Sequence, residues 1–70
     1  MRVLVSDNLA QVGVDIMKNA GLEVDVKTGM TPDELKAVIG DYDGLVIRSA
    51  TKVTAEIIES ASRLRVVGRA

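Results

Sequence analysis

A permanent cation stands at the end of one of the most hydrophobic segments of this 70-residue chain. The apolar run Gly44 to Ile47 is followed directly by Arg48 and Ser49. A guanidinium is a planar fork of donors that matches a carboxylate or a phosphate, and a serine hydroxyl adds another donor. Arg69 follows a second apolar segment, so a further cation is available. These residue types are those of an anion-binding site.

A nearby carboxylate offers a purely structural explanation for the same arginine. Asp7 follows another apolar run, and a local ion pair between Asp7 and Arg48 can form if the two runs are neighbouring strands. Spacing alone leaves both interpretations open. Ser6 and Asp7 are themselves expected to cap the following helix rather than to act in catalysis. Lys52 is expected to be a solvated loop lysine.

Strand-like segments recur along the chain with helix-like segments between them. Arg2 to Asp7 and Gly44 to Ile47 are predicted as strands that are apolar on both faces. Apolar and charged residues alternate from Leu22 to Lys27, which predicts a strand with one solvated face. Leu64 to Gly68 is predicted as a fourth strand.

The sequence predicts three helices between these strands. The first shows a stripe of apolar and small residues at helical spacing, with Gly21 as its stop signal. The members of this stripe are Leu9, Val12, Gly13, Ile16, Met17 and Ala20. A capping box with proline at the first helical position predicts a second helix from Pro32 to Ile39, closed by Gly40. Thr54 is predicted to cap the third.

The resulting order, β-α-β-α-β-α-β, predicts an α/β fold. With right-handed crossovers it becomes a flavodoxin-like doubly wound parallel sheet with strand order 2-1-3-4. Ligands bind such sheets beyond the carboxyl ends of the strands, where the strand order reverses. That point lies between strands one and three, so it is flanked by Asp7 and Arg48. Strand four is left as an unprotected edge, which predicts self-association.

Composition argues against several classes of protein. Nine basic and ten acidic residues give a net charge of −1, which argues against nucleic-acid or membrane partners. Without cysteine or histidine there is no disulfide, and a transition-metal site is not expected. No signal-peptide pattern is present and no apolar run approaches ~18 residues, so a cytoplasmic location is expected. No glycine-rich nucleotide fingerprint occurs.

Four stretches together resemble a known family. VLVSD, GLEVDVKTGMTPDEL, DYDGLVIRSATKVTAEII and RLRVVGRA are similar to the amino terminus of the D-3-phosphoglycerate dehydrogenases, a branch of the D-2-hydroxyacid dehydrogenases. The combination of RSATKVT with VVGRA is the most specific part. The resemblance implies that residues 1–70 are an N-terminal fragment of a substrate-binding domain. It also implies that Arg48, Ser49 and Arg69 help to hold the substrate's charged groups.

The same resemblance implies a longer parent enzyme. Members of the family oxidise 3-phospho-D-glycerate to 3-phosphohydroxypyruvate with NAD, in serine biosynthesis. Their NAD-binding Rossmann domain and their catalytic Arg, Glu and His have no counterpart in residues 1–70, so no catalytic or cofactor-binding residue is assigned. The fragment alone is expected to be inactive and to bind 3-phosphoglycerate weakly or not at all. The alternative is an excised or engineered, self-associating half-flavodoxin module without catalytic or ligand function.

Overall fold

The computed structural model describes residues 1–8, 10–48 and 51–69. Strands and helices alternate in the predicted order. The elements are β1 (Arg2–Val5), α1 (Gln11–Asn19), β2 (Glu23–Val26), α2 (Pro32–Val38), a 3₁₀ turn (Ile39–Asp41), β3 (Gly44–Ile47), α3 (Ala55–Ser60) and β4 (Val66–Arg69). No helix of the described part is long and apolar enough to cross a membrane.

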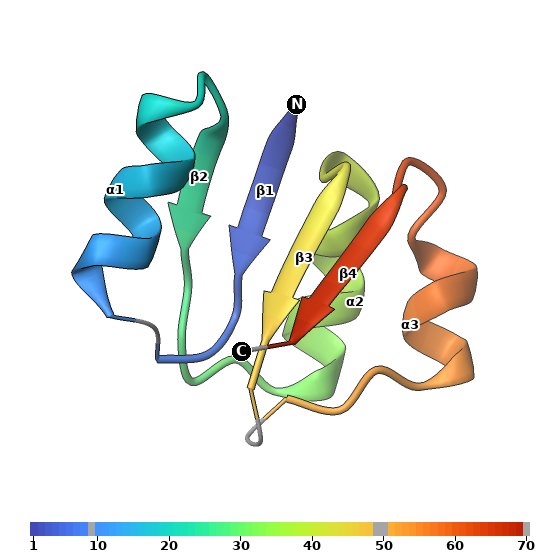
Figure 1. The fold of residues 1–70 in the computed structure, drawn as a ribbon. Helices are drawn as coiled ribbons and strands as arrows, with labels where there is room; N and C mark the ends of the chain where they lie inside the picture. Colours follow the sequence, from blue (N-terminus) through green and yellow to red (C-terminus); the bar gives the residue numbers. More distant parts are fainter. Residues whose placement is uncertain (9, 49–50, 70) are drawn as a thin grey trace.

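The four strands form one sheet, and every neighbouring pair in it is parallel. Their order is β2-β1-β3-β4, with all arrows in Figure 1 pointing the same way. The predicted α/β class and the strand order 2-1-3-4 are therefore confirmed. Leu4 lies in register with Asp25 on β2 and with Leu45 on β3. The carboxyl ends of β1 and β3 are thus side by side, as a switch-point site requires.

One face of the sheet carries the main hydrophobic core. Leu4 and Leu45 are neighbours on this face and are 0% and 1% exposed. Residues of α2, the 3₁₀ turn and α3 pack against them, and Figure 1 shows these two helices on the side of β3 and β4. The other buried members of the cluster are Leu35, Ile39, Tyr42, Ile47, Ile57 and Ala61. Aliphatic burial therefore fixes the strands that present the switch point.

The predicted apolar stripe of α1 is only partly correct. Val14 is the buried residue of this helix, whereas Val12 and Ile16 are 66% and 63% exposed. Leu9, the first member of the stripe, lies outside the described residues. The apolar arc of α1 is wide, since positions 12, 13, 14, 16 and 17 are all apolar or small. Only the part of this arc around Val14 is covered by the rest of the described chain.

The helix ends follow the sequence signals closely. Thr31 and Glu34 form the predicted reciprocal capping box at α2, with hydrogen bonds of 3.2 and 3.1 Å. Thr54 caps α3 by accepting the N–H of Ile57. Gly40, predicted to close the second helix, instead lies within the 3₁₀ turn that extends it. The α-helix continues here as a tighter 3₁₀ turn instead of ending at Gly40.

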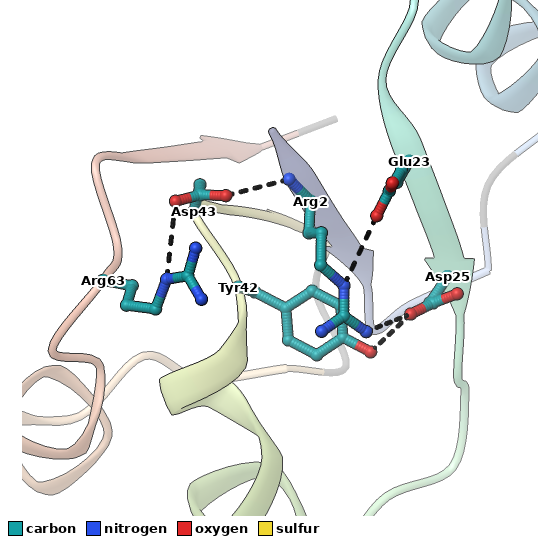
Figure 2. A network of polar contacts seen from close by, with 6 residues as sticks. All are labelled: Arg2, Glu23, Asp25, Tyr42, Asp43 and Arg63. Atoms are coloured by element: carbon teal, nitrogen blue, oxygen red, sulfur yellow. Dashed lines mark hydrogen bonds and ion pairs between the residues drawn. The ribbon is translucent and has the colours of Figure 1, made fainter.

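A polar network joins the start of β1 and the residues just before β3 to side chains of β2 (Figure 2). The Tyr42 hydroxyl donates to Asp25 Oδ2 at 2.7 Å, and Arg2 Nη2 donates to the same oxygen at 3.2 Å. The Arg2 guanidinium also lies 4.8 Å from the centre of the Tyr42 ring. The Asp43 carboxylate accepts the N–H of Arg2 at 2.9 Å. The turn around Tyr42 is therefore a buried anchor.

This network is structural rather than catalytic. Tyr42 is 2% exposed, and burial together with its bond to Asp25 raises the pKa of its hydroxyl. The bond from the Tyr42 hydroxyl, joined by that from Arg2, lowers the pKa of the Asp25 carboxyl despite partial burial. A phenol that is harder to ionise and a carboxylate that is harder to protonate are poor partners for proton transfer near neutral pH. Their contacts join β1, β2 and the start of β3.

Replacing Tyr42 with phenylalanine is expected to lower the free energy of unfolding by about 1–2 kcal/mol, because a hydrogen bond to a charged acceptor is lost while the ring remains. Urea denaturation followed by circular dichroism measures this change. Adding Asp25→Ala to Tyr42→Phe provides the double-mutant cycle. Strictly additive effects of the two substitutions would mean that the bond contributes nothing to stability.

Candidate functional site

A buried carboxylate organises the carboxyl edge between β1 and β3. Asp7 follows β1 and is 4% exposed. Its Oδ2 atom accepts the backbone N–H of Arg48 and, at 3.0 Å, the backbone N–H of Thr51. The end of β1 therefore holds the segment that follows β3. Asp7 was not selected for this role from the sequence, because a side chain that bonds a distant backbone leaves no local pattern.

The predicted helix-capping role of Ser6 and Asp7 is wrong. The N-cap of α1 is Ala10, and no side chain caps it. Ser6 instead places its hydroxyl 3.0 Å from that of Thr51, beside the bonds of Asp7. Both side chains after β1 thus bind the segment after β3 rather than their own helix. Tertiary proximity has replaced the local contact that the residue types favour.

Arg48 lies at the predicted switch point, and its side chain is exposed. One guanidinium nitrogen, Nη1, donates to the backbone carbonyl of Asn8 at 3.0 Å. Among the described residues, the guanidinium makes no ion pair with Asp7. The proposed local ion pair is therefore replaced by a bond between the Asp7 carboxylate and the Arg48 backbone. Other donors of the guanidinium fork remain for a ligand.

The electrostatics of Asp7 favour its charged form. Burial alone would raise the pKa of this carboxyl. The hydrogen bonds from Arg48 and Thr51, together with the nearby Arg48 charge, outweigh burial and hold the pKa of Asp7 below its ordinary value. Asp7 is consequently an anion at neutral pH. The Asp7 carboxylate binds the backbone N–H groups of Arg48 and Thr51. The Arg48 guanidinium is bonded instead to the neutral backbone carbonyl of Asn8.

Of the other two predicted site residues, Arg69 is described by the structure and Ser49 is not. Arg69 is the last residue of β4, is exposed, and lies in register with Ile47. Arg69 therefore lies at the same edge of the sheet as Arg48. Arg48 comes one residue after Ile47, with which Arg69 is paired. Register places Arg69 on the face of Ile47, which is the face of the main core. Ser49 lies outside the described residues. Contact of these residues with a substrate stays a prediction.

The described residues do not fit a dinucleotide cofactor. The turn after β1 reads SDNLA, without the glycines that let a backbone approach a pyrophosphate. The buried carboxylate of Asp7 would also repel such an anion at that turn. No group of three or more acidic side chains that could hold a metal ion occurs in the part of the chain that the structure describes.

Comparison with known proteins identifies relatives of this chain. Residues 3–70 match the family model "D-isomer specific 2-hydroxyacid dehydrogenase, catalytic domain". The D-3-phosphoglycerate dehydrogenases of Synechocystis and Archaeoglobus fulgidus are 49% and 46% identical to this chain, over 99% and 100% of its length. The human D-3-phosphoglycerate dehydrogenase is 46% identical over 99% of it. The chain spans only 12–13% of the length of these relatives.

Solved structures give the same result for the fold. A crystal structure from Pyrococcus horikoshii superposes with a TM-score of 0.90 at 31% identity, covering 97% of this chain and 20% of that one. The NAD+-bound 3-phosphoglycerate dehydrogenase of Entamoeba histolytica has a TM-score of 0.82 at 22% identity, covering 99% of this chain and 25% of its own. The family resemblance predicted from the sequence is confirmed: the chain belongs to the D-isomer specific 2-hydroxyacid dehydrogenases.

Proposed function

We propose that this chain is the amino-terminal part of the substrate-binding domain of an NAD-dependent D-3-phosphoglycerate dehydrogenase. The parent enzyme would oxidise 3-phospho-D-glycerate to 3-phosphohydroxypyruvate in the pathway to serine. Within it, Arg48, Ser49 and Arg69 would hold the charged groups of the substrate. NAD would be bound by a separate Rossmann domain outside residues 1–70, since the chain itself lacks a glycine fingerprint.

One observation carries the proposal: an exposed arginine stands at the switch point, with its backbone fixed by a buried carboxylate. Asp7 binds the N–H of Arg48, and Asn8 uses only one nitrogen of the guanidinium. A site of this kind is partly organised before the ligand arrives, which reduces the ordering cost of binding. Bidentate recognition of a carboxylate or phosphate is the chemistry that arginine performs best. The relatives' names supply the substrate class.

Titration with 3-phosphoglycerate tests the role of Arg48. Arg48→Ala is expected to weaken binding by roughly tenfold or more, because a charge-assisted hydrogen bond is lost. Arg48→Lys should recover only part of it, since an ammonium lacks the planar fork. Isothermal calorimetry or NMR titration measures the affinity. Lys36→Ala, an exposed cation on α2, is the matched control. Equal affinities for all four proteins would overturn the assignment.

Residues 1–70 alone are proposed to be inactive in hydride transfer. The chain contains no histidine that could serve as general acid or base. An assay of NADH formation with 3-phosphoglycerate and NAD should therefore give only background. Turnover above the background of a protein-free control would contradict this part of the proposal.

The alternative is a self-associating module without ligand function. It is favoured by the exposure of β4, where Val66 and Val67 are 52% and 44% exposed on an edge strand. Unpaired edges of this kind are templates for pairing with another chain. Light scattering after gel filtration tests the self-association, which is expected under both proposals, and a monomer at high concentration would contradict it. Titration with 3-phosphoglycerate distinguishes the two, because saturable binding, however weak, is expected only of the dehydrogenase fragment.

A further inference from the structure

The two edge strands of the sheet carry opposite charges on the face of the main core. β2 and β4 are the outer strands in Figure 1, and each has one side without a neighbouring strand among the described residues. Asp25 of β2 is in register with the core residue Leu4, so Asp25 and Glu23 lie on the core face. Arg69 of β4, and by alternation Arg65, lie on the same face. One edge is therefore acidic and the other basic.

The charges of both edges are accessible to a second copy of the chain. The side chains of Glu23 and Asp25 are 77% and 44% exposed, and both pair with the guanidinium of Arg2, at 3.7 and 3.2 Å. Two carboxylates share one cation, so this part of β2 keeps a negative charge. Arg65 and Arg69 are exposed and form no ion pair among the described residues. The β4 edge therefore keeps both positive charges.

These charges oppose the pairing of identical edges. Related by a twofold axis perpendicular to the sheet, two copies of β4 run antiparallel. If such a pair is centred on Val67, Arg65 of each copy lies opposite Arg69 of the other. Two copies of β2 likewise bring Glu23 of one opposite Asp25 of the other. Because like charges directly opposite each other destabilise a sheet, a closed dimer through one kind of edge is disfavoured.

We propose that copies of this chain assemble head to tail, with β4 of one copy added in parallel to β2 of the next. The strands then run in one direction across the junction, as they do within the chain. Different surfaces of the two copies meet, so each copy still offers one edge of its own, and the assembly grows unless a ring closes. The proposal names the strands that meet and does not depend on a substrate or on dehydrogenase activity.

Charge and the alternation of faces select one register for this junction. With Arg69 opposite Asp25, opposite charges pair directly on the core face. Glu23 then lies diagonally between Arg65 and Arg69, within reach of their long side chains. A register two residues further along β2 would place Arg69 opposite Lys27, which carries a like charge. The first register is therefore the one that we expect.

Sedimentation velocity and light scattering over a range of concentrations test the open assembly. The weight-average mass should rise past that of a dimer as the concentration increases, because every copy offers both edges. Raising NaCl from about 50 to 500 mM should weaken association roughly threefold or more, because salt screens the attraction between exposed opposite charges. A chain that stays monomeric, a plateau at the mass of a dimer, or association that strengthens with salt would overturn the proposal.

Charge-reversal variants at exposed positions identify the two edges. The double substitution Arg65→Glu and Arg69→Glu is expected to weaken association roughly fivefold or more, because like charges then meet across the junction. Glu23→Lys alone, on the other edge, should have an effect in the same direction. Lys36→Glu, an exposed position on α2 outside both edge strands, is the matched control and should leave the affinity within about twofold.

Mixing the two edge variants provides the decisive measurement. At a concentration where each variant alone is monomeric, an equimolar mixture should form pairs with nearly the original affinity. The basic β4 of the Glu23→Lys chain then meets the acidic β2 of the chain that carries Arg65→Glu and Arg69→Glu. Absence of pairs in the mixture would refute the proposal. Undiminished association of Glu23→Lys alone would also refute it, because the contact would then join β4 to β4.

Discussion

Replacing Asp7 with alanine is expected to lower the free energy of unfolding by about 2–4 kcal/mol, because two backbone N–H groups lose their acceptor. The carboxylate is 4% exposed and receives the N–H groups of Arg48 and Thr51. Asp7→Asn should lose less, since its amide oxygen can still accept. Urea denaturation followed by circular dichroism gives the free energy, and amide hydrogen exchange at Arg48 and Thr51 reports the local loss.

The matched control for this substitution is Asp15→Ala. Asp15 is an exposed carboxylate on α1 that accepts from Gln11 at 2.9 Å, so its loss should change stability by no more than about 0.5 kcal/mol. Similar unfolding free energies for Asp7→Ala and Asp15→Ala would show that Asp7 does not organise the loop.

The same carboxylate predicts a dependence on pH. Its pKa in the folded chain is lowered, mainly because hydrogen bonds from Arg48 and Thr51 outweigh the effect of burial. A depressed folded pKa contributes stability above the unfolded value of about 3.9, and this contribution is lost as pH falls through the folded pKa. Stability should therefore decline on acidification below about pH 5. In Asp7→Asn the decline should be shallower, with the remainder due to Asp25 and Asp43.

Replacing Leu4 with alanine is expected to lower the free energy of unfolding by about 3–5 kcal/mol, because the substitution leaves an empty space at the centre of the core. Leu4 is 0% exposed and pairs with Leu45 beneath α2 and α3. A chain of 70 residues is marginally stable, so this loss approaches its whole stability. Thermal unfolding and the dispersion of the NMR spectrum measure the outcome.

Val12→Ala is the control for the core substitution. This substitution also removes apolar side-chain atoms, but Val12 is 66% exposed on α1. The free energy of unfolding should therefore fall by no more than about 0.5 kcal/mol. A Leu4→Ala protein with a cooperative transition as stable as that of Val12→Ala would contradict the assignment of the core to the α2 and α3 face.

The fold was predictable because local signals and topology agreed. The capping box at Thr31 and the cap at Thr54 are written in adjacent residues, and both are present. The strand order followed from which strands are apolar on both faces. The position of Arg48 at the switch point followed from that order. Its ligand role was suggested by residue type and family resemblance.

Features that depend on long-range contacts were not predictable. Asp7 and Thr51 are 44 residues apart, and nothing in the sequence around either one indicates that they bond. Asp41 and Asp43, which flank Tyr42, are residue types typical of exposed loops, so the local sequence does not indicate that Tyr42 is buried. Its burial depends on Arg2 and Asp25, which come from two other strands. The orientation of α1 was misjudged because an arc of apolar residues does not say which part of it is covered.

The hydrogen bond between the Asp7 carboxylate and the backbone of Arg48 fixes the course of the main chain at position 48 independently of the side chain that this position presents. The main chain at position 48 is held through an atom that every residue except proline possesses. Among the described residues, the side chain at that position is joined to the loop after β1 by its bond to the Asn8 carbonyl. A different side chain can therefore be placed at the edge of the sheet while the loop keeps its course. Such an arrangement allows the side chain presented at this edge to vary by single substitutions without rebuilding the loop.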